Sequence, residues 1–249
     1  MGIQCLYRTL IECLRAGKLI PFVGAGVSKS ITKKVGGTLF PDWKELLELA
    51  AVTLEAEQKH RDAALVRACL NVDQCKYLEA AQHARTALGS IRHEFLKKHL
   101  NPNFDLMDGN SLALPRAIWE LGSQLIMTTN YDRVLQWSCS NPYDYRGLDI
   151  EQKVELVELL RNNAKQPTVW HLHGKIDNAA ELILTTDDYG RLYPNNGEAC
   201  YKAALETLKQ HLASKSLLFI GSVSTTNISI RNFAISAKFS MAQRGRITY

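Results

Sequence analysis

Residues 18–28 read KLIPFVGAGVS, and this stretch decides the fold class. Its first half, residues 19–23, is a short apolar run of the kind that forms a strand buried on both faces. Its second half places glycines at positions 24 and 26, where a tight turn or a close approach of the backbone requires them. A buried strand that runs into a glycine turn is typical of the first unit of a parallel α/β sheet.

Four further apolar stretches have the length of strands. They read QLIMTT at 124–129, TVWHLHG at 168–174, LILTT at 182–186 and LLFIG at 217–221. Segments with a helical pattern lie between them, at 3–16, 42–100, 149–163, 187–193 and 198–214. Short apolar strands that alternate with helices predict a mostly parallel sheet covered on both faces.

The helical stretch between the first two strands is long enough to form a unit of its own. Asp42 precedes it as a plausible N-cap, and the turn-rich residues 101–111 end it. We therefore predict an α/β fold with a Rossmann-like, mostly parallel sheet covered by helices and a smaller helical insertion domain. The expected parts are a Rossmann-like core at 1–41 and 116–222, the insertion at 42–115 and a divergent basic tail at 223–249.

The composition excludes several classes of protein. None of the 6 cysteines forms a C-x-x-C pair, so no zinc ribbon is present. No apolar stretch approaches the roughly 20 residues that span a bilayer, and the amino terminus does not fit a secretory signal. The net charge of +5 arises from basic residues after Glu206, and we find no basic face with interleaved aromatics before them. We expect a cytoplasmic protein that binds neither membranes nor nucleic acid.

Glycines and polar residues gather where the predicted strands end. The first strand ends in GAGVS at 24–28, the second in TTNYD at 128–132, the third in HLHG at 171–174 and the last in GS at 221–222. In an open parallel sheet, ligands bind at the carboxyl ends of the strands. These four segments are therefore the candidate site.

The glycine turn and Asn130 each allow two interpretations. Glycines let the backbone approach a pyrophosphate, but Lys29 stands where G-x-G-x-x-G has its third glycine, so the turn could equally serve packing. Asn130 follows a strand and begins a predicted helix, where it could be an N-cap with Asp132 in the first turn. Such a cap could still leave the carboxamide facing a pocket.

Three interpretations compete for His171 and His173. As a metal pair they lack the further ligands that zinc requires, so we expect no metal. Both could instead be structural histidines in the core. One of them could be a general base, because imidazole titrates near neutral pH. On a regular strand both side chains point to the same face, so geometry alone does not choose between them.

In this order and spacing, GAGVS, PDW at 41–43, TTNYD, HLHG and FIGS resemble the sirtuin superfamily over about residues 18–222. The chain looks most like the bacterial sirtuin-like domains of anti-phage defence proteins, because a helical block stands in place of the zinc ribbon. The resemblance implies an NAD⁺ glycohydrolase, with NAD as its substrate and no metal. The alternatives are an NAD-dependent protein deacylase and a non-catalytic module that binds NAD or ADP-ribose.

The resemblance also implies a role for each site residue. Asn130 would hold the attacking water or the nicotinamide ribose, and His173, directly before a glycine, would be the general base with His171 as its support. The residues implied in NAD binding are Gly24, Ala25, Gly26 and Ser28 at the phosphates and ribose, Asp42 in a covering loop, Asp132 at the nicotinamide end, and Gly221 and Ser222 at the adenosine side. The implied partners are further copies of the chain, and a partner protein or fused sensor domain.

Overall fold

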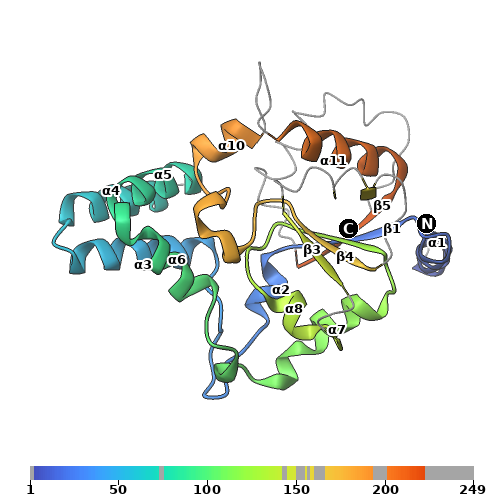
Figure 1. The fold of residues 1–249 in the computed structure, drawn as a ribbon. Coiled ribbons are helices and arrows are strands. Elements are labelled where there is room, and N and C mark those ends of the chain that lie inside the picture. The colour runs from blue at the N-terminus through green and yellow to red at the C-terminus, as the bar shows by residue number, and fades with distance from the viewer. Residues whose placement is uncertain are drawn as a thin grey trace.

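The computed structural model describes residues 3–72, 76–141, 145–149, 155, 158–159, 166–192 and 201–221. Within these residues, parallel strands form a 5-stranded sheet in the order β3-β4-β2-β1-β5 (Figure 1). The strands are β1 (Leu19–Val23), β2 (Leu125–Thr128), β3 (Arg146–Leu148), β4 (Thr168–His171) and β5 (Ser216–Ile220). The predicted parallel α/β sheet is confirmed.

Two strands differ from the prediction. The expected strand at 182–186 is wrong, because residues 182–185 form no strand. They connect the 3₁₀ helix η4 (Ile176–Glu181) to the helix α10 (Thr186–Leu192). Leu182, Ile183 and Leu184 are buried all the same, so the apolar run reflects packing outside the sheet. The edge strand β3 was not predicted, since its three residues carry no apolar pattern. The helix expected at 149–163 lies for the most part outside the described residues.

Helices cover both faces of the sheet. On one face, α10 and α11 (Lys202–Ser214) share a buried cluster with Phe22, Met127 and Trp170 of the strands. On the other face, α2 (Ala25–Lys29), α7 (Ala113–Glu120) and α8 (Val134–Ser138) share a cluster with Val23 and Ile126. Figure 1 shows the two groups on opposite sides of the strands. Successive strand residues point to opposite faces, so burial on both faces makes the central strand β1 apolar throughout.

Four helices gather beside the sheet in a group that we call the helical lobe (Figure 1). They are α3 (Trp43–Ala56), α4 (His60–Leu70), α5 (Tyr77–Leu88) and α6 (Arg92–Leu100), with the 3₁₀ turn η1 (Gly89–Ile91) between the last two. Alanines at 50, 51, 63, 80, 81 and 84 are buried in its core. Side chains of this size let helix axes approach closely.

The chain enters the lobe through a capped helix and leaves it through two 3₁₀ turns. Asp42 and Glu45 form a capping box at the start of α3, which confirms the predicted N-cap. After α6, the turns η2 (Phe104–Leu106) and η3 (Gly109–Leu112) carry Met107 and Leu112 into the core under the sheet. The expected insertion at 42–115 thus contributes to two cores, and its boundaries stay a prediction. Before β1, α1 (Ile3–Arg15) stops ahead of Gly17, whose φ is +60°.

The helical lobe is tied to α10 by polar contacts. Arg85 of α5 donates from Nη1 to Asp188 Oδ1 at 2.5 Å, and Gln82 Nε2 donates to Asp187 Oδ2 at 2.8 Å. The side chain of Asp188 is nearly buried. Despite burial, the hydrogen bond with the Thr185 side chain, the backbone N–H groups and the Arg85 charge hold the pKa of its carboxyl group below the ordinary value. The lobe therefore fixes the start of α10 through an ionised, well-partnered carboxylate.

Candidate active site

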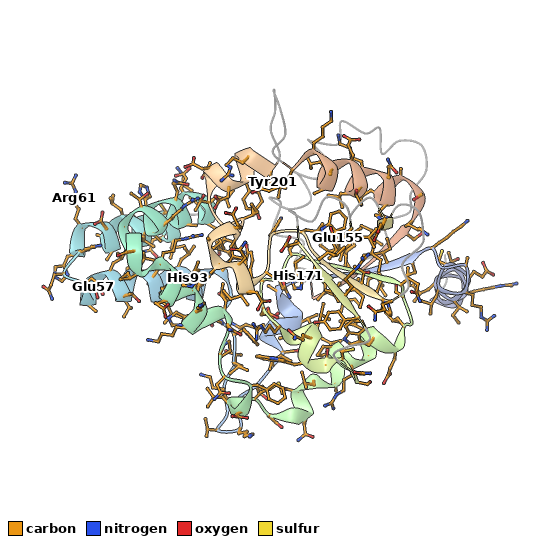
Figure 2. The ribbon with its side chains drawn as sticks, viewed as in Figure 1. Glu57, Arg61, His93, Glu155, His171 and Tyr201 are labelled. Atoms are coloured by element: carbon orange, nitrogen blue, oxygen red, sulfur yellow. The ribbon has the colours of Figure 1, made fainter. Side chains whose placement is uncertain are left out.

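The connections after β2 and β4 leave the sheet toward opposite faces. β2 leads into α8 on one face, whereas β4 leads through η4 into α10 on the other. The two strands are neighbours, and Thr128 pairs with His171 at their carboxyl ends. Adjacent strands with diverging connections form the usual ligand site of an open α/β sheet. We call this place, residues 128–132 and 171–173, the crevice. Figure 2 shows His171 near the middle of the molecule, between the sheet and the helical lobe.

Asn130, Ser28 and Asp132 form one hydrogen-bonded cluster at the crevice. Asn130 Nδ2 donates to Gly24 O at 2.9 Å and to Ser28 Oγ at 2.8 Å, and Ser28 Oγ donates to Asp132 Oδ2 at 2.6 Å. Because a carbonyl oxygen only accepts, the NH₂ group of Asn130 must be the one that faces Gly24. Its Oδ1, for which the described residues provide no partner, is left to accept a hydrogen bond from a ligand or water.

Asp132 supplies the side-chain acceptor at the start of α8. Its Oδ1 accepts from the Val134 N–H at 2.9 Å, and burial raises the pKa of this carboxyl group against the lowering effect of the Ser28 hydrogen bond. The expectation that Asn130 begins this helix is wrong, because α8 starts at Val134. Asn130 is therefore released from a capping role, and its carboxamide turns to Ser28 and Gly24 instead.

The glycine turn packs against the end of β5. The Gly24 N–H donates to Ile220 O at 2.9 Å, and the Gly26 N–H donates to Gly221 O at 2.7 Å. A Cβ atom on Gly26 would lie 2.7 Å from Gly221 O, and one on Gly221 would lie 2.5 Å from Val27 N. The φ of Gly221 is also +65°, which disfavours other residues. The packing interpretation of these glycines is thus supported by direct backbone contact.

Gly26→Ala is expected to lower the free energy of unfolding by about 1–3 kcal/mol, because the added methyl group overpacks the backbone of Gly221. Gly190→Ala in α10 is the matched control. A Cβ atom there meets nothing within 4 Å, so we expect no loss, or a gain of up to about 1 kcal/mol. Urea unfolding followed by circular dichroism measures both, and equal midpoints for the two variants would refute the contact.

Asp42 is held by structural contacts beside the glycine turn. Its Oδ1 accepts from the Glu45 N–H at 2.9 Å, and its Oδ2 accepts from Lys29 Nζ at 2.8 Å. Lys29, which stands where the third glycine was missing, also donates to Glu45 Oε2 at 2.5 Å. This group joins the end of α2 to the start of α3. The other outlying residue of the predicted site, Ser222, lies outside the described residues.

His171 reaches across the crevice from the end of β4. Its Nδ1 lies 2.9 Å from Asn130 O, an acceptor, so Nδ1 carries the hydrogen and Nε2 is the unprotonated nitrogen. The residue is 8% exposed, and burial lowers the pKa of its imidazole to about 4. His171 also borders a cavity of about 190 Å³ that Asp132, Tyr145 and Lys175 help to line. It is a neutral ring that holds the loop of Asn130 to β4.

His173 lies beyond the end of β4, so the two histidines do not share one face of a regular strand as expected. It is 2% exposed, and its Nδ1 lies 3.4 Å from the hydroxyl oxygen of Tyr189 on α10. Its Nε2 is buried and has no hydrogen-bond partner in the described part of the chain. Burial lowers the pKa of this imidazole to about 4. His173 is thus a neutral ring with one unsatisfied nitrogen.

The burial of His173 predicts an acid-sensitive fold. Its pKa is about 4 in the folded chain and about 6.5 in an unfolded one, so unfolding takes up a proton between these values. The stability is complete above pH 6.5 and falls as the pH drops toward 4, by roughly 1–3 kcal/mol for this residue. We expect His173→Gln to flatten the curve of unfolding free energy against pH. His93→Gln, at the exposed His93 on α6 (Figure 2), is the control, and curves flattened equally in the two variants would refute the prediction.

Residues 124–247 match the protein family described as SIR2-like domain. The chain contains a SIR2-like domain. The predicted sirtuin resemblance is confirmed, and the match extends past residue 222, where we expected it to end. In the described residues of this SIR2-like chain, no group of three or more His, Cys, Asp or Glu side chains could hold a metal. No helix in the same residues has the length and apolar character needed to cross a membrane.

Two curated proteins resemble the SIR2-like chain over most of its length. It is 28% identical over 225 residues to the NAD(+) hydrolase ThsA of Enterococcus faecium, which is 89% of this chain and 40% of that protein. It is 26% identical over 219 residues to the NAD(+) hydrolase ThsA of Cytobacillus dafuensis, which is 88% of this chain and 38% of that protein. The chain thus spans about two fifths of the length of these relatives.

Proposed function

We propose that this chain is an NAD⁺ glycohydrolase, which cleaves NAD⁺ into nicotinamide and ADP-ribose in bacterial anti-phage defence. The observation that carries the proposal is the Asn130 cluster, which lies beside His171 at the carboxyl ends of β2 and β4 in a SIR2-like domain, with His173 buried just past the end of β4. The similarity to two NAD(+) hydrolases over most of the chain supports the same activity.

The reaction replaces the bond between the ribose and nicotinamide with a bond between the ribose and a water oxygen. The C–N bond to nicotinamide breaks and the ring nitrogen keeps the electron pair, while a water oxygen bonds to the same carbon and gives up a proton. Like other reactions at this sugar carbon, it passes through an oxocarbenium-like transition state. The protein therefore has to position water and tolerate positive charge. Asn130 suits this task, because its carboxamide cannot ionise and its NH₂ group is already fixed by Gly24 and Ser28.

We assign to His173 the role of accepting the proton that the attacking water gives up. A neutral imidazole is required to accept a proton, and burial keeps this ring neutral at pH 7. Its Nε2, without a partner among the described groups, is the nitrogen we expect to accept. A positioned general base contributes about 10²–10⁴-fold in rate. We assign His171 a supporting role, because its Nδ1–H holds the backbone carbonyl of Asn130.

The remaining predicted site residues are proposed to bind NAD⁺. The N–H groups of Gly24 and Gly26 already donate to Ile220 and Gly221, so in this turn we assign the phosphate contact mainly to the exposed Ala25 at the start of α2. We expect Ser28 to reach the ribose and Asp132 to orient the nicotinamide end. Gly221 and Ser222 would face the adenosine side, and Asp42, held by Lys29, would belong to the covering loop.

Product analysis tests this proposal. The purified 249-residue chain is incubated with NAD⁺, and nicotinamide and ADP-ribose are quantified by liquid chromatography. We expect both products in equal amounts without any acylated peptide. Release of O-acetyl-ADP-ribose only when an acetylated peptide is added would assign a deacylase instead. Binding of NAD⁺ in a calorimeter without consumption would assign a non-catalytic module.

We also propose that the chain acts in the cytoplasm as a homo-oligomer, switched on by a partner protein or a sensor domain. The relatives that it matches are more than twice as long, which leaves room for a sensing part in such proteins. Light scattering of the purified chain at micromolar concentration is expected to give a mass above one chain. A strict monomer at every concentration would contradict the oligomer.

A further inference from the structure

We propose that Tyr189 is a positioning residue for His173. Its hydroxyl oxygen accepts a hydrogen bond from the Nδ1–H group of His173, so that Nε2 carries the lone pair that can accept a proton. The inference deepens the proposed function, in which His173 takes a proton from water. Nothing in the sequence pattern singles out Tyr189, which lies in the short helix α10. Its role follows from the contacts of the two rings.

The two rings are in direct contact inside the core. The Tyr189 hydroxyl oxygen lies 3.4 Å from His173 Nδ1, and the ring centroids are 5.2 Å apart in an edge-on arrangement of 67°. Both residues are buried. A distance of 3.4 Å is long for a hydrogen bond, as is common for catalytic contacts before substrate binds. Among the described residues, one nitrogen of His173 thus has a partner and the other has none.

The cost of burying an unpaired donor decides which nitrogen carries the hydrogen. If the Tyr189 hydroxyl donated to Nδ1, the hydrogen of the neutral ring would sit on Nε2 as a buried N–H without an acceptor in the described residues. Buried N–H groups without an acceptor are rarer in proteins than buried acceptors without a donor, because such a donor loses its hydrogen bond to water and gains none in return. If Nδ1–H donates to Tyr189 instead, Nε2 keeps a lone pair, and the phenol still has its own hydrogen to donate.

Burial also keeps both groups uncharged. It raises the pKa of the Tyr189 hydroxyl and lowers the pKa of the His173 imidazole. A transfer of the phenol proton to the histidine would create a buried ion pair from two groups that are both neutral. The contact is therefore a neutral hydrogen bond that sets a tautomer, and the tautomer is the one a base requires.

Both partners are held by one short loop and by the helical lobe. The His173 carbonyl oxygen accepts from the Ile183 N–H at 3.0 Å, which closes the loop between β4 and α10. At the start of α10, the Asp188 carboxylate accepts from the Thr185 N–H at 3.1 Å and from Arg85 Nη1. Tyr189 follows Asp188 directly, so the lobe contact fixes the position of the phenol against His173.

Tyr189→Phe tests the positioning role, because it keeps the ring and removes only the hydroxyl. We expect kcat for NAD⁺ cleavage to fall by roughly 10-fold or more with KM changed by less than about twofold, since a misoriented base affects the chemical step. The matched control is Tyr201→Phe, which removes a hydroxyl from another buried tyrosine of the same core cluster. A kcat for Tyr189→Phe equal to that of Tyr201→Phe would overturn the role.

A second readout does not depend on activity. The ¹⁵N chemical shifts of a histidine ring distinguish the Nδ1–H from the Nε2–H tautomer, and the His173→Gln protein identifies the signal. We expect the Nδ1–H form in the wild-type chain and a shift toward the Nε2–H form in Tyr189→Phe. A wild-type His173 in the Nε2–H form overturns the inference. If the tautomer is as expected but the chain does not cleave NAD⁺, the proposed function fails while the assigned contact stands.

Discussion

Asn130→Ala is expected to reduce nicotinamide release by about 10²-fold or more, with the fold retained. The substitution removes the one carboxamide oxygen that the crevice offers to the attacking water, and losing a preorganised polar group of this kind costs about 10²–10³-fold in kcat. The variant also loses the donors to Gly24 and Ser28, so its stability has to be measured beside its activity. Initial rates with saturating NAD⁺ and a urea curve on the same sample give both values.

Ser28→Ala is the matched comparison for this prediction. It removes the hydrogen bonds that Ser28 makes with Asn130 and Asp132 but leaves the carboxamide in place. We expect a smaller loss than for Asn130→Ala, on the order of 10-fold. If Ser28→Ala and Asn130→Ala lose activity equally, Asn130 contributes through the cluster alone and has no direct role at the reacting atoms.

His173→Ala is expected to lose about 10²–10⁴-fold in kcat, the range typical of a general base. His171→Ala is expected to lose less, roughly 10-fold, because it removes a hydrogen bond to the Asn130 carbonyl and no reacting group. The two variants are compared in rate and in the pH dependence of kcat, since removal of the base also removes the limb of the profile that it causes.

The opposite result has a definite meaning. His171 borders the cavity at the crevice, and its Nε2 is also the unprotonated nitrogen of a neutral ring. If His171→Ala loses the larger factor while its urea curve matches that of His173→Ala, the two histidines have exchanged roles. Equal, small losses of kcat in both variants would show that neither histidine acts as a general base.

The sheet was largely predictable because its central strands are buried on both faces. Strands such as β1 and β2 must then be almost wholly apolar, and such a run is visible in the sequence. The same reasoning explains the two errors. Residues 182–184 are apolar because Leu182 and Leu184 pack in the core of the helical lobe and Ile183 packs in the cluster on the sheet. The strand β3 has only one fully buried residue, Leu148, to signal a strand. An apolar run in the sequence indicates that its residues are buried, but it does not show whether their backbone pairs with a strand.

The positions of the candidate residues at the ends of the strands could be read from the sequence, but their contacts could not. Asn130 looked like an N-cap because asparagine often is one, yet Asp132 supplies the acceptor at α8. The pair of histidines could not be separated in the sequence, since the point where β4 ends decides where each ring points. Tyr189 was missed altogether, because its contact with His173 depends on the path of the loop between β4 and α10. These features depend on tertiary geometry.

The central claim is that the crevice between β2 and β4 cleaves NAD⁺. The most direct measurement is the rate of nicotinamide release from saturating NAD⁺ by the wild-type chain, Asn130→Ala and the Gly190→Ala control, over a range of protein concentrations. We expect steady release by the wild type and by Gly190→Ala, and a rate lower by about 10²-fold or more for Asn130→Ala. No release by the wild type at any concentration, or equal rates for all three proteins, would contradict it.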